Sequence, residues 1–250
     1  MNWHELLRHP AGGDHIVQTW QDEAFLADAV AEYAASGLRA GEAVLLATTP
    51  HNRDLLQRRL ETIAVQHGQL RYLDAEQALA RFMQGEMPEW KSFHHLIGGQ
   101  IAELGLRYPA VRVYGEMVDV LWRRGEQDAA LRLEDFWNEL ARLQTFSLFC
   151  AYRLDPLDAA QYGPLECVCK AHTHFIPARD YERLDEAVAA ASREVLDQTL
   201  AQMLLSLSAN QRPATHMPPG QAALLWLHKN MPRTAEKVLS GVRDRVGPTA

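Results

Sequence analysis

The sequence has few cysteines, no long apolar run and no excess of positive charge. Its 250 residues include three cysteines, Cys150, Cys167 and Cys169. An odd number excludes a framework of paired disulfides and favours a reducing compartment. No apolar stretch approaches the roughly 20 residues that a membrane-spanning helix needs, and the first residues lack the pattern of a secretory signal. We therefore expect a cytoplasmic protein without a membrane partner.

The charge is unfavourable for direct binding to nucleic acid. The formal net charge is -7 at pH 7, whereas such binding needs a basic face. Near the C-terminus, Glu236 and Asp244 dilute a set of Lys and Arg residues. We expect no direct contact with nucleic acid, and contact through a protein partner stays open.

The sequence does contain an alternation of short apolar segments and amphipathic ones. Hydrophobic residues make up 47% and charged residues 23%, which suits a globular chain with its own core. Strands are predicted at 15–20, 43–48, 70–73, 110–114 and 146–152, with helical patterns between them. This order predicts an α/β fold, a three-layer sandwich with a mostly parallel sheet, followed by C-terminal helices.

Composition divides the chain into three segments. Residues 1–14, broken by Pro10 and two glycines, are predicted to be a flexible arm, residues 15–179 the α/β domain, and residues 180–250 a helical region. Within the last, we predict a long helix at 180–208, a proline-rich linker near 211–220, and one final helix or a helix pair. The alanine-rich long helix suits packing on its own domain or a homodimer interface.

The turn after the strand at 43–48 reads Thr48-Thr49-Pro50-His51-Asn52. A nucleotide-binding fold has its phosphate loop here, but this turn lacks the glycines and the Lys-Ser/Thr pair that cradle phosphate. We therefore predict no functional phosphate loop and no ATP hydrolysis, and leave open a nucleotide bound in another way. No catalytic motif is recognisable, so we do not expect an enzyme, and the sequence requires no cofactor.

Candidate ligand-binding side chains lie at predicted strand ends and on one helix. Glu116 follows the strand at 110–114, at the edge where α/β folds bind ligands; alternatively it is a carboxylate at a helix start. Glu134 and Asn138 are four residues apart and share a helix face. Cys150 lies in the strand at 146–152.

Two further groups of residues have competing interpretations. His15 begins the first predicted strand and Asp22 follows it, and Asp22 is either a pocket residue or a helix N-cap. The tract Cys167-Val-Cys169-Lys-Ala-His172-Thr-His174 carries thiols and imidazoles, which bind thiophilic metals. Cys169, His172 and His174 are the metal candidates, but no second ligand pair stands at a defined spacing. A redox role, a ligand contact and a plain helix end all remain open for this tract.

Five segments resemble, in the same order, the MEDS domain, the methanogen/methylotroph DcmR sensory domain. They are HIVQTWQDEAFLADAV, GLRAGEAVLLATTPHNRDLLQRRL, VYGEMVDVLWRRGEQDAALRLEDFWNEL, FSLFCAYRL and CVCKAHTHFIP, between His15 and Pro177. The resemblance implies a RecA/KaiC-like fold without a functional phosphate loop, and a bacterial or archaeal module that senses a small organic ligand. It carries no catalytic residues over, and Trp20 stands where tyrosine is common. The ligand-binding positions that it implies are His15, Asp22, Glu116, Glu134, Asn138, Cys150, Cys169, His172 and His174.

These observations predict a cytoplasmic signal-transduction protein. A small molecule would bind near Glu116 and Cys150, and the C-terminal helices would pass the signal to a regulatory partner, such as a kinase or transcription-related protein, or to a dimer interface. No kinase, ATPase or helix-turn-helix module is recognisable in 180–250. The alternatives are a metal or redox switch built on the Cys/His tract, a degenerate RecA-like nucleotide-binding protein, and an interaction adaptor.

Overall fold

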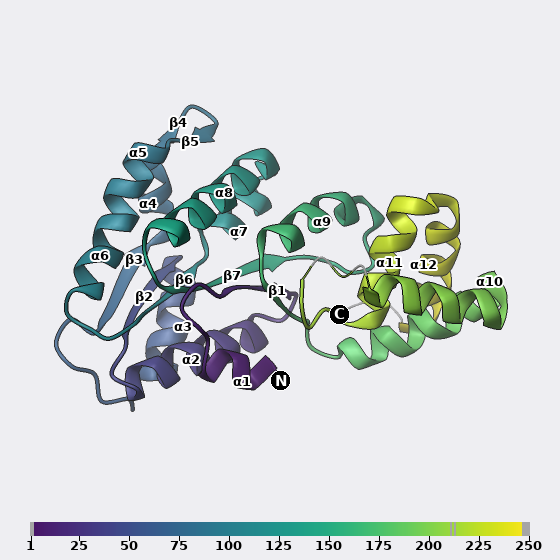
Figure 1. Cartoon of the computed structure of the whole chain (residues 1–250), viewed down its shortest axis with the longest axis horizontal. Coiled ribbons are helices and arrows are strands. Elements are labelled where there is room, and N and C mark those ends of the chain that lie inside the picture. The colour runs from purple at the N-terminus through teal and green to yellow at the C-terminus, as the bar shows by residue number, and fades with distance from the viewer. Residues whose placement is uncertain (1–2, 211, 213, 247–250) are drawn as a thin grey trace. The chain divides into compact units, whose positions relative to one another are not determined.

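The computed structural model describes residues 3–210, 212 and 214–246 and divides the chain into two compact units, residues 1–153 and 154–250 (Figure 1). The strands of unit 1 are β1 (His15–Trp20), β2 (Ala43–Thr48), β3 (Leu70–Asp74), β4 (Met83–Gln84), β5 (Met87–Pro88), β6 (Val111–Gly115) and β7 (Ser147–Arg153). Its helices are α1 (Trp3–Arg8), α2 (Glu23–Arg39), α3 (Pro50–Leu60), α4 (Ala75–Phe82), α5 (Trp90–Phe93), the π-helical η1 (His94–Gly98), α6 (Gly99–Gly105), α7 (Met117–Arg123) and α8 (Gln127–Leu143).

Unit 1 is built on a parallel sheet whose strands run in the order β3-β2-β6-β7-β1. In Figure 1, α1, α2 and α3 cover one face of this sheet, and α4 to α8 cover the other. Every residue of β1, β2 and β6 is buried, as expected for parallel strands covered on both faces. The predicted α/β fold with three layers is confirmed.

Local sequence signals explain where these helices begin. The Asp22 carboxylate accepts hydrogen bonds from the backbone N–H groups of Ala24 and Phe25, and so caps α2. Asp74 caps α4 in the same way through the Gln77 N–H. Pro50 occupies the first turn of α3, where its missing N–H costs nothing.

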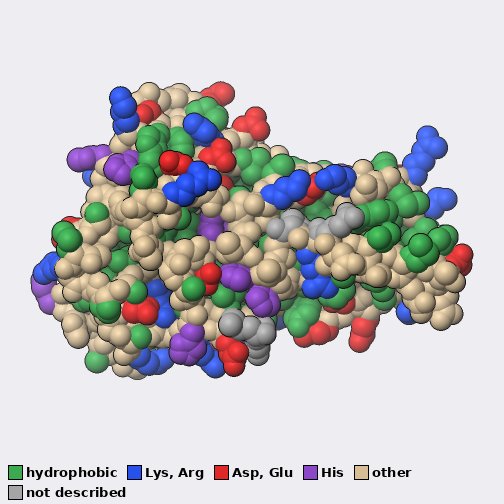
Figure 2. All heavy atoms as spheres, viewed as in Figure 1, with side chains coloured by type: hydrophobic (Ala, Val, Ile, Leu, Met, Phe, Trp, Pro, Cys, Tyr) green, Lys and Arg blue, Asp and Glu red, His purple; other side chains and the backbone are tan. Residues whose placement is uncertain are grey.

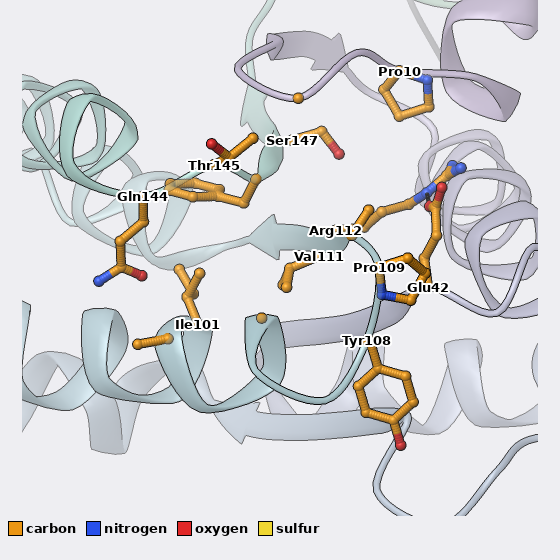
Figure 3. A pocket seen from close by; sticks show the side chains of 15 residues that line it. Pro10, Glu42, Ile101, Tyr108, Pro109, Val111, Arg112, Gln144, Thr145 and Ser147 are labelled. Carbon is orange, nitrogen blue, oxygen red and sulfur yellow. Dashed lines mark hydrogen bonds and ion pairs between the residues drawn. The ribbon is translucent and has the colours of Figure 1, made fainter.

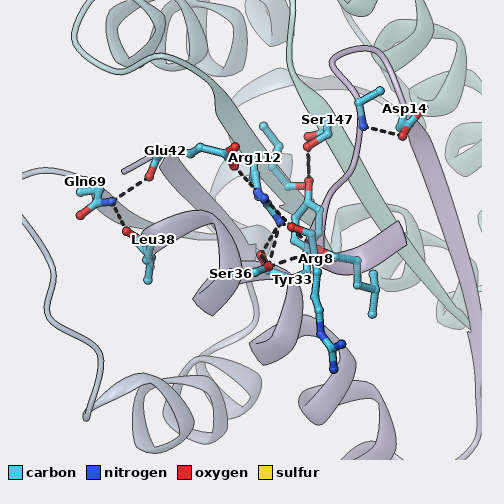
Figure 4. Close-up of polar contacts among 12 residues, drawn as sticks. Arg8, Asp14, Tyr33, Ser36, Leu38, Glu42, Gln69, Arg112 and Ser147 are labelled. Carbon is cyan, nitrogen blue, oxygen red and sulfur yellow. Dashed lines mark hydrogen bonds and ion pairs between the residues drawn. The ribbon is translucent and has the colours of Figure 1, made fainter. Parts of the chain in front are cut away.

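Residues 3–14 differ from the predicted flexible arm, and residues 1 and 2 lie outside the described part. Residues 3–8 form α1, which packs on α2 and buries Leu6 and Leu7. The buried guanidinium of Arg112, on β6, donates to the backbone oxygens of Leu7 (2.9 Å) and Arg8 (3.0 Å) (Figure 4). The helix is held by a side chain more than 100 residues away, which local composition does not reveal.

The last helical run before β6 consists of three elements in series. Glu89 caps α5, which continues through η1 into α6 and ends at Gly105. Before it, β4 and β5 form a short hairpin that the sequence pattern did not indicate.

Unit 2 is mostly helical. Its elements are η2 (Ala159–Gln161), α9 (Tyr162–Ala171), the short strand β8 (His174–Ile176), α10 (Tyr181–Asn210), α11 (Pro219–Asn230) and α12 (Pro232–Val246). Helices α10, α11 and α12 pack on one another. The final segment is a helix pair, the second of the two predicted forms, and it divides at Met231-Pro232. Residues 211 and 213 of the predicted linker lie outside the described part.

The predicted long helix is interrupted. Asp197 has a positive φ of 66° inside α10, and its carboxylate accepts from the N–H groups of Thr199 and Leu200. Asp197 therefore ends one helical segment and caps the next. Among the described residues, no helix is both long and apolar enough to cross a bilayer.

Candidate functional site

The polar core of unit 1 lies between β1, β7 and α8. β1 and β7 are parallel neighbours, and Val17 pairs with Cys150 while His15 pairs with Leu148. Side chains two residues apart on a strand share a face, so His15, Cys150 and Tyr152 point to the same side of the sheet. On α8, Glu134 and Asn138 are one turn apart and meet these side chains. We call these five residues the His–Glu–Cys cluster.

The three donor atoms at the centre of this cluster lie close together. His15 Nε2 lies 3.3 Å from Glu134 Oε2 and 3.5 Å from Cys150 Sγ, and Cys150 Sγ lies 4.0 Å from Glu134 Oε2. Two outer hydrogen bonds orient them. The Asn138 amide oxygen lies 3.1 Å from His15 Nδ1, and the Tyr152 hydroxyl donates to Glu134 Oε1 over 2.5 Å.

The His–Glu–Cys cluster lies in the protein core. The exposed fractions are 4% for His15, 1% for Glu134 and 0% for Cys150. Burial, and then the Glu134 charge, raise the pKa of the Cys150 thiol well above its ordinary value. The same two causes raise the pKa of the Tyr152 hydroxyl. Ionisable groups are costly in such an environment unless they are paired or coordinate a ligand.

Trp137 borders this cluster. Its ring lies over Gly115, the register partner of Cys150, where an added Cβ would meet the ring carbon at 3.5 Å. The indole N–H is buried and has no hydrogen-bond acceptor among the described residues. A buried donor without an acceptor is unusual and favours a ligand with an acceptor atom beside the cluster.

Glu116 belongs to a second polar group, at the carboxyl ends of β2 and β6. Its carboxylate accepts from the Thr49 N–H (2.8 Å), the Thr49 hydroxyl and the Asn52 amide (2.6 Å). Asp119, one turn further, accepts from the Arg153 N–H and pairs with Arg123 Nε at 2.9 Å. Burial is the main cause that raises the pKa of both carboxyls.

The contacts of Glu116 bear on nucleotide binding. Thr49 precedes α3 and Asn52 lies in its first turn, at the position where a phosphate loop would hold an anion. Here the Glu116 carboxylate is that anion. Phosphate could bind at this helix start only if Glu116 moved, which counts against the degenerate nucleotide-binding alternative.

The predicted site residues therefore separate into groups. The structure brings His15, Glu134, Asn138 and Cys150 together, and it places Glu116 in the second polar group. Asp22 is the α2 N-cap described above, the second of its two interpretations.

Three predicted site residues lie in unit 2. Cys169 is buried in α9, and the imidazole of His172 at the end of that helix donates from Nδ1 to the Val168 oxygen over 2.6 Å. His174, on β8, bonds the Thr215 hydroxyl. Among the described residues, Cys169, His172 and His174 do not form one metal-donor group.

Sequence reasoning missed several members of both groups. Tyr152 stands two residues after Cys150, a spacing that places both on one strand face. Asp119 and Arg123 follow Glu116 at helical spacing, three and seven residues on. The sequence shows these spacings, but it does not show the order of the strands in the sheet, which decides which of these side chains meet.

A pocket of about 330 Å³ lies at the end of the strands opposite to the end where Glu116 lies. Figure 3 shows Ile101, Val111, Gln144 and Ser147 around it. Val111 and Ser147 are the first residues of β6 and β7, so this pocket is at the amino ends of the strands. None of the predicted site residues lines it.

Comparisons with known proteins agree with the family resemblance. A search among curated proteins found no match. The family described as MEDS, MEthanogen/methylotroph, DcmR Sensory domain, matches residues 14–173, a range that contains every residue of the His–Glu–Cys cluster and of the group around Glu116. Because that match spans more than half of the sequence, the chain belongs to the MEDS family of sensory domains.

Proposed function

We propose that this protein is a ligand-responsive regulator whose signal is recognised at the His–Glu–Cys cluster. The observation that carries the proposal is the burial of His15, Glu134 and Cys150 within 4.0 Å of one another in the core of unit 1. Clusters of ionisable groups in a core destabilise a fold unless they are fully compensated, and they concentrate at functional sites.

Trp137 supports a ligand at the same place. Its buried N–H offers a donor beside the cluster, and the cluster itself supplies an imidazole, a carboxylate and a thiol. A small ligand with an acceptor atom would satisfy the indole while contacting these groups. Sites of this kind combine an apolar lining with a few convergent polar groups.

The route for the signal begins on β7. Cys150 and Tyr152 lie on this strand, and Arg153 is its last residue before unit 2. A ligand that moved Cys150 or Tyr152 would act on the segment that joins the two units. It would change the output only if its affinity differed between two arrangements of the protein.

The output surface that we propose is the second segment of α10. Leu200, Met203 and Leu207 recur at helical spacing and are 49%, 54% and 43% exposed. Figure 2 shows apolar side chains on the surface of the unit 2 helices, interspersed with charged side chains. We propose that this face binds a second copy of the chain, and that a kinase or transcription-related partner receives the signal.

A thermal-unfolding screen with small organic compounds and divalent metal ions tests ligand recognition. A ligand at 100 times its dissociation constant stabilises by about 2.7 kcal/mol, or roughly 5 to 10 °C for a chain of this size. We expect the shift in the wild type and in Glu116→Gln, which keeps the His–Glu–Cys cluster intact, and its loss in Glu134→Gln. A shift that survives Glu134→Gln would place recognition outside the cluster.

A further inference from the structure

We infer that His15, Glu134 and Cys150 form a binding site for a thiophilic divalent metal ion of the zinc class. The inference rests on the proposed function, since it names the ligand of the same cluster. It differs from the metal site considered for the Cys/His tract, because His15, Glu134 and Cys150 all lie in unit 1.

The spacing of the donor atoms fits one ion. Bonds of about 2.0 Å to nitrogen and oxygen and about 2.3 Å to sulfur, at tetrahedral angles, separate nitrogen from oxygen by about 3.3 Å and sulfur from either by about 3.5 Å. His15 Nε2 lies 3.3 Å from Glu134 Oε2 and 3.5 Å from Cys150 Sγ. The third separation, Cys150 Sγ to Glu134 Oε2, is 4.0 Å and would close by only about 0.5 Å.

The hydrogen bonds around the cluster aim its lone pairs inward. An amide oxygen only accepts, so the bond to Asn138 Oδ1 places a proton on His15 Nδ1. In the neutral imidazole, Nε2 then presents a lone pair toward Glu134 Oε2, 3.3 Å away. Two acceptors facing each other at this distance require a proton or a cation between them.

The same hydrogen bonds match the outer shell of known metal sites. Ligand histidines donate their second N–H to an oxygen, and ligand carboxylates are themselves hydrogen-bonded. His15 donates to Asn138 in this way, and Tyr152 donates to the Glu134 oxygen that does not face His15. Both outer residues are held by regular elements, α8 and β7.

The donor set selects the class of ion. One imidazole nitrogen, one carboxylate oxygen and one thiolate sulfur are ligands of Zn²⁺ and related ions, whereas Mg²⁺ and Ca²⁺ prefer oxygen alone. A divalent ion would neutralise the thiolate and carboxylate charges in the core. As the sulfur–metal bond forms, the Cys150 thiol releases its proton to solvent. A zinc-class ion takes four ligands, so one further donor would complete the set.

The test is metal titration of the full chain after removal of bound metal with a chelator. Zn²⁺ binding is measured by competition with a chromophoric chelator, and Co²⁺ binding by the thiolate-to-cobalt absorption band. We expect one ion per chain. Cys150→Ser should remove the band and weaken binding at least about 100-fold. Cys169→Ser, which changes the other buried cysteine, should bind like the wild type.

A second variant covers the case in which Cys150→Ser fails to fold. Asn138→Ala keeps all three donors but removes the acceptor of His15, so binding should weaken about 10- to 100-fold. Absence of binding by the wild type, or unchanged binding in a folded Cys150→Ser, would overturn the inference.

The inference and the proposed function can fail separately. An organic ligand that stabilises the wild type but not Glu134→Gln, in a chain that binds neither ion, would overturn the metal site and keep the sensor. An ion bound at the cluster that leaves hydrogen exchange of β7 and unit 2 unchanged would establish a structural metal site and contradict the sensor.

Discussion

Replacement of Arg112 by methionine should destabilise unit 1 by about 3 to 5 kcal/mol, the usual cost of breaking a buried ion pair. The Arg112 guanidinium is buried and pairs with Glu42. It also donates to the backbone oxygens of Leu7, Arg8 and Tyr33 at 2.9 to 3.0 Å. Methionine preserves much of the apolar stem, so the change isolates the polar contacts.

Two responses to the substitution compete, and the cheaper one sets the cost. If α1 stays docked, several buried acceptors lose their donor, at about 1 to 3 kcal/mol each. If α1 detaches, water hydrates the freed oxygens, but Leu6 and Leu7 lose their burial at about 1.5 to 3 kcal/mol each. Both routes cost several kcal/mol, so relaxation does not rescue the variant.

Urea unfolding measures the loss of free energy, and hydrogen exchange over residues 3–8 shows whether α1 detaches. The matched control is Arg71→Met, which removes a two-bond ion pair with Glu103 on the surface. That pair should contribute less than about 1 kcal/mol. Equal losses for the two variants, or a loss below about 1 kcal/mol for Arg112→Met, would refute the reasoning.

Three further predictions concern the carboxylate group, a helix contact and the surface of unit 2. Burial raises the pKa of Glu116 above its ordinary value of 4.5, so folding takes up a proton and the free energy of unfolding should fall as pH rises above 4.5. Urea unfolding at several pH values should show a smaller fall for Glu116→Gln than for the wild type, and an equal fall in both proteins would contradict this prediction. Gly37→Ala should cost about 1 to 3 kcal/mol in urea unfolding, because its Cβ would meet Arg112 at 2.6 Å. Gly99→Ala, with open space around its Cβ, should instead gain about 0.5 to 1 kcal/mol; a loss at both positions would exclude this contact as the cause. Leu200→Glu should reduce the mass measured by light scattering toward one chain, while Met231→Glu, also exposed, should not; a wild type that is already a single chain would exclude the dimer.

Periodicity predicted most of the fold, because parallel strands and amphipathic helices carry strong local patterns. Glu134 and Asn138 were predicted to share a helix face, and both lie on α8. Elements without a repeating pattern were missed. The first helix has only six residues, and its stabilising partner Arg112 is remote in sequence. Asp197 looks like an ordinary helix residue until its positive φ shows that it caps a second segment.

The candidate site was predictable in composition but not in geometry. Family resemblance pointed to His15, Glu134 and Cys150 as separate positions. Their meeting depends on β1 pairing with β7 across more than 120 residues, which no local pattern specifies. Asp22 was chemically ambiguous, and only its contacts distinguish a helix cap from a ligand residue. Resemblance also placed Cys169, His172 and His174 among the site residues, but it could not say whether their side chains form one group.

Native mass spectrometry of freshly purified protein, compared with the mass after denaturation, tests most directly whether the His–Glu–Cys cluster holds a ligand. The measurement is made on the wild type, Glu134→Gln and Glu116→Gln without chelators. We predict an extra mass of one divalent metal ion in the wild type and in Glu116→Gln, and its loss in Glu134→Gln. The same difference between native and denatured mass in all three proteins, whether or not a ligand is bound, would contradict recognition at the cluster.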